Sequence, residues 1–290
     1  MSLTRTVEFD AFGPWILPVT TPDEVPRAFH EYPFEFDSAD FILKLPRDIE
    51  RRNANPAMHL YDRLLIVDAA GLTVLTRTGD GFDVSAIGAD TIAAVAHSSE
   101  LLDGLLTVHG TDGALVEVPF NGVSIALIVA VANRLGALAG ATSYRARPSD
   151  PMAIDALGLG DVALANAYRE AAATTSGLRV RAAYAGTSPA SKESIVARAL
   201  KGRARLSGAV ICANDAELIV LSRRSGVRRG GKPDLSSKQT TIVRSRVTGV
   251  EASAHPSLRG VTVVTIALGD GRVAFDVPAD GDAVEALRAR

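Results

Sequence analysis

The chain contains one sequence pattern twice, and this repeat limits its possible folds more than any other feature. Residues 64–77 (LLIVDAAGLTVLTR) align without a gap with residues 210–223 (VICANDAELIVLSR). A pattern of this length that occurs twice is typical of a duplicated domain, because solenoids need several shorter units. An Asp-Gly turn and a Val-Pro pair then recur in the same order, as Asp112-Gly113 and Val118-Pro119 in the first copy and as Asp270-Gly271 and Val277-Pro278 in the second.

Within each copy, runs of β-branched residues are separated by turns that contain Gly or Asp, which is typical of antiparallel hairpins. The hydrophobic pattern of residues 82–97 fits either a strand or a helix, but the matching residues 240–253 favour a strand. Each copy ends in a helical pattern, over Val123–Leu138 and from an N-cap at Asp280. The expected hairpins are Arg63–Val67 with Leu72–Thr76, Leu105–His109 with Ala114–Val118, Ala209–Ile211 with Leu218–Ser222, and Val261–Leu268 with Arg272–Val277.

Further helices are predicted outside the two copies. Pro46 suits the first turn of a helix, and Asp48 and Glu50 would stabilise its positive end. Another helix is expected from Ser188 to Arg205, at the matching place before the second copy. An alanine-rich helix is expected over Met152–Ala173.

The first sixty residues carry most of the aromatic side chains, and prolines interrupt any long helix there. Large aromatic side chains seldom stay in water, so we expect an extended arm that lies over a neighbouring surface, with an aromatic-lined pocket as the alternative. The expected organisation is an arm plus helix (1–60), a first repeat (61–140), a helical connector (141–206) and a second repeat (207–290).

The charge is distributed unevenly along the 290 residues. Residues 1–150 hold 11 Lys and Arg against 20 Asp and Glu, a net charge of −9, whereas residues 151–290 hold 20 against 13, a net charge of +7. Such asymmetry suggests either an anionic partner for the basic half or two halves that dock by complementary charge.

Other features bear on the compartment. The single cysteine, Cys212, excludes an internal disulfide, and its place in a predicted strand suggests a buried side chain. The N-terminus lacks the pattern of a signal peptide. The most apolar segment, residues 123–132, is shorter than the roughly 20 residues that cross a bilayer. We therefore expect a cytoplasmic protein that does not span a membrane.

The order of strands, Asp-Gly hairpin and closing helix resembles that of bacterial pleckstrin-homology-like domains. The residues that carry the likeness are Leu72–Leu75, Ile92, Val95, Leu105–Val118 and the helix after Gly122, and then Leu218–Leu221, Val247, Val250, Val261–Val277 and the helix after Asp280. The resemblance implies an α+β fold of two antiparallel curved sheets or partly open barrels, each closed by a C-terminal helix and joined by a helical segment. It also implies binding of lipid headgroups or peptides. The whole chain resembles an uncharacterised protein family of high-GC bacteria, which implies no activity.

A basic segment over residues 223–246 is the most distinctive charge feature. Its glycines would let backbone amides approach an anion. Such a segment could contact nucleic acid, an anionic membrane surface or an acidic protein, or be a solvated hairpin tip. The candidate binding residues are Arg223, Arg224, Arg228, Arg229, Lys232, Lys238, Arg244 and Arg246.

Enzymatic activity is not favoured by the sequence. The histidines show no metal-ligand spacing, and no nucleophile or phosphate-loop motif is present, so no catalytic residue, metal or cofactor is assigned. We expect a non-enzymatic binding or scaffold protein whose partner is another protein or a second copy of itself. The alternatives are a polyanion-binding module that uses the basic segment, and an enzyme with a site between the domains around Arg51, His59 and Asp62.

Overall fold

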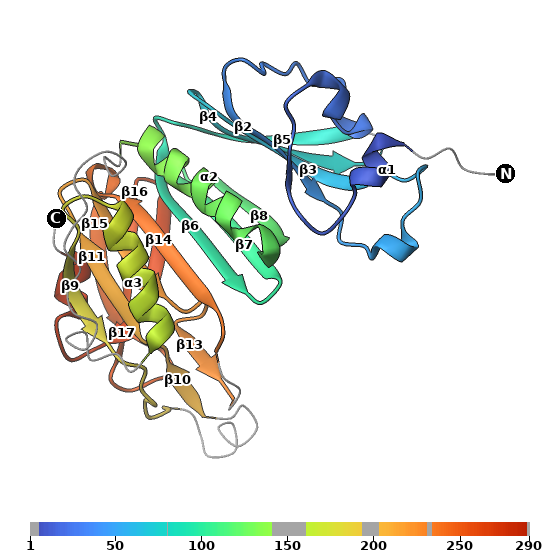
Figure 1. Ribbon diagram of the computed structural model, residues 1–290. Coiled ribbons are helices and arrows are strands. Elements are labelled where there is room, and N and C mark those ends of the chain that lie inside the picture. Colours follow the sequence, from blue (N-terminus) through green and yellow to red (C-terminus); the bar gives the residue numbers. More distant parts are fainter. Residues whose placement is uncertain (1–5, 80, 141–160, 193–202, 231–233, 289–290) are drawn as a thin grey trace.

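The computed structural model describes residues 6–79, 81–140, 161–192, 203–230 and 234–288 (Figure 1). Within these residues the fold is α+β and consists mainly of antiparallel strands. None of the sheets formed by the described strands closes into a barrel. No described helix has both the length and the apolar character needed to cross a membrane.

The first sheet has five strands in sequence order and is buried on both faces at its centre. Along β3, Leu65 and Val67 face one core, whereas Leu64 and Ile66 face another, because successive side chains of a strand point to opposite faces. The strands are β1 (Leu17–Pro18), β2 (Ala39–Pro46), β3 (Tyr61–Asp68), β4 (Gly71–Thr78) and β5 (Gly81–Gly88).

The N-terminal arm covers the outer face of this sheet. Phe29, which is fully buried, packs with Ile42 and Leu64 of the sheet. Lys44 also helps to hold the arm, because its Nζ donates to the carbonyl oxygen of Glu24 at 2.9 Å. The expectation that the arm lies over a neighbouring surface is thus confirmed. Its short elements are α1 (Val7–Ala11), η1 (Pro22–Glu24) and η2 (Arg27–Phe29), with η3 (Arg51–Asn53) after β2.

The second sheet contains strands from both halves of the sequence. Its order is β8-β7-β6-β14-β12-β11-β9, and β6 pairs with β14 from Ser99↔Ser237 to Ala94↔Ile242. The sheet is therefore continuous across the boundary between the two copies (Figure 1). The strands are β6 (Ile92–Glu100), β7 (Asp103–Gly110), β8 (Leu115–Asn121), β9 (Arg179–Tyr184), β11 (Ala209–Ala213), β12 (Glu217–Ser222) and β14 (Ser237–Val243).

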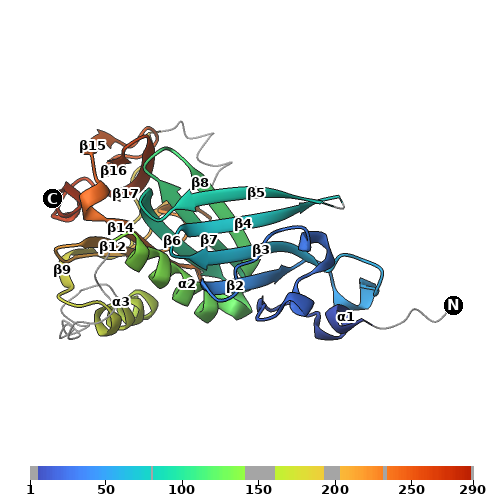
Figure 2. The same cartoon turned by 90° about the horizontal axis from the view of Figure 1, so that it is seen from above.

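A third sheet, in the order β15-β16-β17, lies at the other end of the molecule from the first sheet (Figure 2). Strands β10 (Ala204–Leu206) and β13 (Val227–Arg229) form a separate short pair. The remaining elements are β15 (Gly249–Ala254), β16 (Val261–Leu268), β17 (Gly271–Pro278), η4 (Gly122–Ser124), η6 (Arg244–Arg246) and the helices α2 (Ile125–Leu138), α3 (Val162–Thr174) and α5 (Ala283–Arg288).

Each half contains four strands that pair in sequence order, followed by three strands and a helix, and the second half also has α3, β10 and β13. In the first half, β2-β3-β4-β5 pair in sequence order, and β6-β7-β8 and α2 follow. In the second half, β9-β11-β12-β14 pair in sequence order, and β15-β16-β17 and α5 follow. The Asp-Gly turns of the two halves also meet, since the amide of Asp270 donates to the carbonyl of Thr111 at 2.7 Å.

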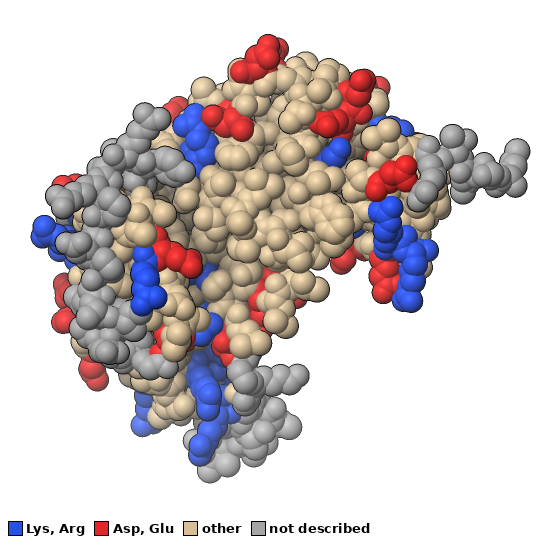
Figure 3. Space-filling view, viewed as in Figure 1, with Lys and Arg blue, Asp and Glu red and all other residues tan. Residues whose placement is uncertain are grey.

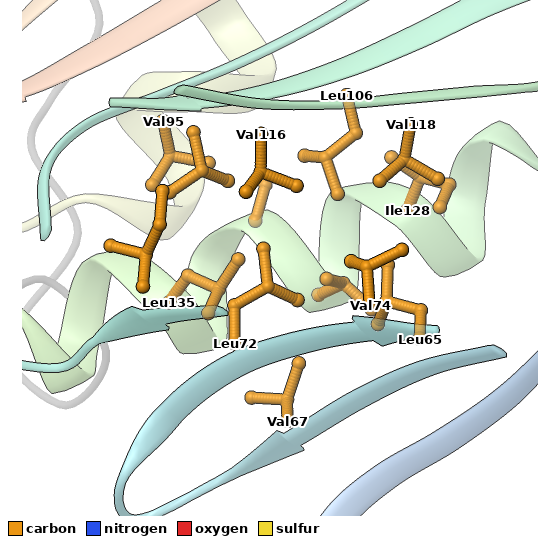
Figure 4. Close-up of a cluster of buried hydrophobic side chains, with 14 of the residues drawn as sticks. Leu65, Val67, Leu72, Val74, Val95, Leu106, Val116, Val118, Ile128 and Leu135 are labelled. Atoms are coloured by element: carbon orange, nitrogen blue, oxygen red, sulfur yellow. The ribbon is translucent and has the colours of Figure 1, made fainter. Parts of the chain in front are cut away.

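Two cores lie on opposite faces of β6. The first is enclosed by β3 and β4, by β6–β8 and by α2, from which Leu65, Leu106 and Ile128 converge (Figure 4). The second lies between the seven-stranded sheet and β15–β17 with α5. Because side chains alternate along β6, Val95 enters the first core and Ala94 the second. Helix α3 packs against the opposite face of β11 and β12, where Cys212 is buried.

The four hairpins expected from the sequence are confirmed. Residues 82–97 lie in two strands, β5 and β6, as the β-branched counterpart in the second copy indicated. The helix expected over 123–138 begins as a 3₁₀ turn and continues as α2. The final helix begins at Ala283, later than an N-cap at Asp280 predicts. Cys212 is buried as expected, and burial raises the pKa of its thiol to about 12.

The helix predicted from Pro46 is wrong. Residues 39–46 form β2, whose Leu43 and Leu45 are buried in the first core, and Pro46 ends the strand. A proline can take the last place of a strand, so its sequence position did not distinguish the two structures. The helix expected from Ser188 to Arg205 is also wrong at both described ends, because Ser191 forms a β-bridge with Leu258 and Ala204–Leu206 form β10. Residues 193–202 of that prediction lie outside the described residues, as does the start of the alanine-rich helix, whose described part forms α3.

We expect the stability of the fold to depend on pH through His97. This side chain faces the first core opposite Leu106, its buried Nε2 finds no hydrogen-bond partner among the described residues, and burial lowers its pKa to about 4. The unfolded chain binds a proton near pH 6.5, so stability is lost as the pH falls below that value towards the folded pKa. At pH 5 this loss is about 2 kcal/mol relative to pH 8.

Urea unfolding at pH 8 and pH 5 measures this loss. The substitution His97→Leu removes the titrating group, so the free energy of unfolding of the variant should fall by less over the same range. Equal pH dependence in the variant and the natural chain would show that His97 is not responsible.

Candidate ligand-binding cleft

A cavity of about 440 Å³ lies between the seven-stranded sheet and the edge strand β17. Its floor comes from β6, β7, β8 and β14, its wall from Arg272, Val273 and Ala274 of β17, and its rim from Arg224 and Ser225. We call it the inter-sheet cleft. Its volume falls in the range of roughly 300–1,000 Å³ that is typical of sites for small ligands.

Strand register determines which side chains form the floor. Thr240 of β14 pairs with Ala96 of β6, which pairs with Thr107 of β7, which pairs with Glu117 of β8. Cross-strand partners share one face of a sheet, so all four lie on the floor. His97, one residue from Ala96, faces the first core instead.

Three cationic side chains line the cleft, those of Arg224, Lys238 and Arg272. Across the described ranges, none of the three makes an ion pair or a side-chain hydrogen bond. Burial lowers the pKa of Lys238, and so does the adjacent Arg224 charge, while Glu117 acts in the opposite direction. Of the lining residues that the structure describes, Glu117 alone carries a carboxylate, so these residues give the cleft excess positive charge.

Two further polar groups belong to the cleft. His109 has a lowered pKa because of burial and the Lys238 charge, with Glu117 opposing, so its imidazole is neutral at pH 7. Thr240 is 1% exposed, and within the described part of the chain its hydroxyl has no hydrogen-bond partner. A buried hydroxyl without a partner costs about 1–3 kcal/mol, so this is an unusual group to keep at the floor of a cavity.

Two more cavities continue from the cleft. A small one of about 90 Å³ shares Arg224, Lys238 and Ala274 with it. The small cavity in turn shares Arg223 and neighbouring residues with a third cavity of about 440 Å³. The cleft and the small cavity therefore border β17, whereas the third cavity borders β10 and the residues that come after β12.

The predicted binding residues do not form one patch. Arg224 and Lys238 lie in the cleft. Arg223 is held by Asp161, with Nη2 2.6 Å from Oδ2, and Arg228 is paired with Asp234 at 3.1 Å. Because each of these two arginines has a carboxylate partner, neither adds to the excess charge of the cleft.

The other members of the set lie elsewhere. Arg229 is exposed on β13. Arg244 lies in η6 and donates to the carbonyl of Asn214. Lys238 is near the start of β14 and η6 follows its end, so the two residues are about 20 Å apart at roughly 3.3 Å per residue. Arg246 lies in the same turn, which corrects the expectation that this pair belongs to a strand. Lys232 lies outside the described residues.

Sequence reasoning missed Arg272, which completes the cationic set of the cleft. It stands alone in the sequence, with no other basic residue near it, so no charge run pointed to it. Only the packing of β17 over the seven-stranded sheet brings it near Arg224 and Lys238. In Figure 3, Lys and Arg side chains gather at the end of the molecule around β10 and β13, away from the uncharged surface over α2.

Two residues of the alternative enzyme site near the arm, Asp62 and Arg51, form hydrogen bonds with other groups of the protein. Asp62 accepts hydrogen bonds from Arg77, from Nε at 3.0 Å and from Nη2 at 2.8 Å. Arg51 donates to the carbonyl of Phe12. Among the residues that the structure describes, no group of three or more His, Cys, Asp or Glu side chains is arranged to hold a metal ion.

Comparison with protein-family models, with curated proteins and with solved structures found no match to this chain.

Proposed function

We propose that the chain is a non-enzymatic binding protein that takes an anionic ligand in the inter-sheet cleft. The observation that carries this proposal is the convergence of three cations without partners, Arg224, Lys238 and Arg272, on one cavity. Burial, and after it the like charge of Arg224, lower the pKa of Lys238, so desolvation and repulsion both disfavour its protonated form. A carboxylate or phosphate group in the cleft would remove the repulsion and form charge-assisted hydrogen bonds.

A compact anionic group fits the cleft better than a long polyanion does. Nucleic-acid surfaces combine a cationic track with aromatic stacking platforms. Among the described lining residues of the cleft there is no Phe, Tyr or Trp, and the other arginines of the basic segment are paired or lie elsewhere. Binding of nucleic acid or an anionic membrane surface is therefore the less supported alternative.

We also propose that the two halves are duplicated pleckstrin-homology-like units. The support is the shared order of a four-stranded part, a three-stranded part and a closing helix, together with the contact between the two Asp-Gly turns. A cytoplasmic location belongs to the same proposal, since the single buried cysteine is consistent with a reducing compartment.

Removing two of the cleft cations should abolish anion binding. We expect citrate and inorganic phosphate to bind the natural chain, and the double variant Arg224→Gln/Lys238→Gln to lose at least about tenfold in affinity, since charged hydrogen bonds contribute about 1.5–3 kcal/mol each. Isothermal titration calorimetry measures this. Arg259→Gln, which removes an exposed arginine before β16, is the matched control and should bind normally. Equal loss in the control would mean that only net charge matters.

The pH dependence of binding should report on Lys238. Burial and the Arg224 charge lower its pKa, whereas Glu117 opposes the shift, so Lys238 loses its proton at a lower pH than an ordinary lysine. Citrate affinity should therefore fall as the pH rises from 8 towards 10. The variant Lys238→Arg keeps its charge over this range and should show a weaker pH dependence. Parallel curves for the two proteins would contradict a role for the Lys238 charge.

Association with a protein partner or a second copy is a second candidate function, favoured by an exposed apolar patch. Leu101, Leu102, Val123 and Trp15 are 74%, 60%, 57% and 48% exposed. The amide of Gly122 donates to Leu102 and that of Ile16 to Ser124, so these segments lie together. Leu101 has φ 55°, and it is the only non-glycine residue with positive φ in the described ranges. Such a conformation costs about 1–2 kcal/mol for a leucine.

If this patch mediates self-association, sedimentation velocity should detect an oligomer whose fraction increases with concentration. The double variant Leu101→Asp/Leu102→Asp should then be monomeric at every concentration. Val84→Asp, which changes a valine that is 54% exposed on β5, is the control and should associate like the natural chain. A natural chain that is monomeric at all concentrations would remove the homodimer from consideration.

A further inference from the structure

Strand β17 is an edge strand, because it pairs only with β16 in the three-stranded sheet. Its residues 272–274 line the inter-sheet cleft, and residues 274–277 line the small cavity that continues from it. The free edge of a strand carries unpaired N–H and C=O groups, and these can pair with another chain. The cleft and the small cavity therefore lie along a strand edge that could accept a partner strand.

The hydrogen bonds of β16 determine which groups of β17 point outward. The carbonyls of Val261 and Ala267 accept from residues on the β15 side, His255 and Thr248. The N–H and C=O groups of successive residues point to opposite sides of a strand. Those of the even-numbered residues of β16 therefore point towards β17.

Val264 and Ile266 are two of these residues, and they pair with Phe275 and Val273. The intervening residues of β17, Arg272 and Ala274, consequently point their N–H and C=O groups away from β16.

An independent contact supports this assignment. The hydroxyl of Tyr184 donates to the carbonyl of Asp276 at 3.2 Å, so the outward direction at Asp276 is occupied by a protein donor. Throughout the described part of the chain, no backbone or side-chain group bonds the outward groups of Arg272 or Ala274. The corresponding edge strand of the first half, β8, has Pro119 in its middle and therefore lacks a donor that β17 has.

We infer that an extended acidic peptide segment of a partner protein binds in the inter-sheet cleft by adding as a strand to the free edge of β17. The inference rests on the proposed anion-binding function and specifies its ligand. Charge complementarity selects an acidic partner, since Arg224, Lys238 and Arg272 surround the position that the added strand would take. Main-chain hydrogen bonds to Arg272 and Ala274 would supply affinity, and the cations would select the side chains.

The floor of the cleft limits the pattern of the peptide. Side chains of an added strand alternate in direction, so only every second one faces Lys238 and Thr240. Glu117 lies on the same floor and would repel acidic side chains placed near it. A peptide with acidic residues at alternate positions therefore fits better than a uniformly acidic one.

The test uses a blocked, fluorescently labelled hexapeptide in which threonine and glutamate alternate, with fluorescence anisotropy as the measurement. Two analogues carry N-methyl groups, one on every threonine nitrogen and the other on every glutamate nitrogen. In an added strand only one of these sets of N–H groups faces β17. We expect one analogue to lose about tenfold or more in affinity and the other to bind nearly normally.

Variants of the protein give a second test of the same contact. Ala274→Pro removes an outward N–H group and leaves the ladder to β16 intact, whereas Ala274→Val keeps that group. We expect the proline variant alone to lose peptide affinity. The N-methyl comparison uses the natural chain, so it remains decisive if the proline variant does not fold.

The outcomes separate this inference from the function on which it rests. If citrate binds but the two methylated peptides behave alike, strand addition is wrong and the anion site remains. Equal binding of a lysine–threonine peptide would overturn the acidic specificity. Binding of heparin or single-stranded DNA without binding of the peptide would assign the cleft to a polyanion. If neither citrate nor any peptide binds, the proposed function is wrong as well.

Discussion

Antiparallel pairing of β6 with β14 is the interaction on which the rest of the structure depends. It runs from Ser99↔Ser237 to Ala94↔Ile242 and joins strands from the two halves into one seven-stranded sheet. Because β6 has one face in each core, its side chains help to stabilise both halves at once. A strand without partners exposes its backbone groups, so separating the halves would expose both β6 and β14 along their shared edge.

The same pairing creates the inter-sheet cleft. It places the polar face of β6, β7 and β8 beside Lys238 and Thr240, while the third sheet covers only part of that face. The uncovered part holds the unpaired cations and ends at the free edge of β17. The cations of the cleft and the free backbone groups of β17 thus lie side by side. A ligand that binds both has carboxylates on an extended peptide backbone.

The hairpins could be predicted because their signals are local. Alternation and turn residues such as Asp112-Gly113 determine which neighbouring strands pair. Pro46 was misread because a proline suits both the start of a helix and the end of a strand, and only the burial of Leu43 and Leu45 distinguishes them. Arg224 and Lys238 were found through their charge run, but the run also included Arg223 and Arg228, whose partners Asp161 and Asp234 depend on the fold.

Local sequence patterns were enough to predict the order of strands and closing helices, since this order depends on patterns within about ten residues. The tertiary structure alone decided that the halves share a sheet, that Arg272 joins Arg224 and Lys238, and that β17 has a free edge. Those features depend on contacts between residues far apart in the chain, such as Thr240 with Ala96, and each depends on register. A one-residue shift would turn every side chain of a strand to the other face, and the local pattern does not encode the distant partner.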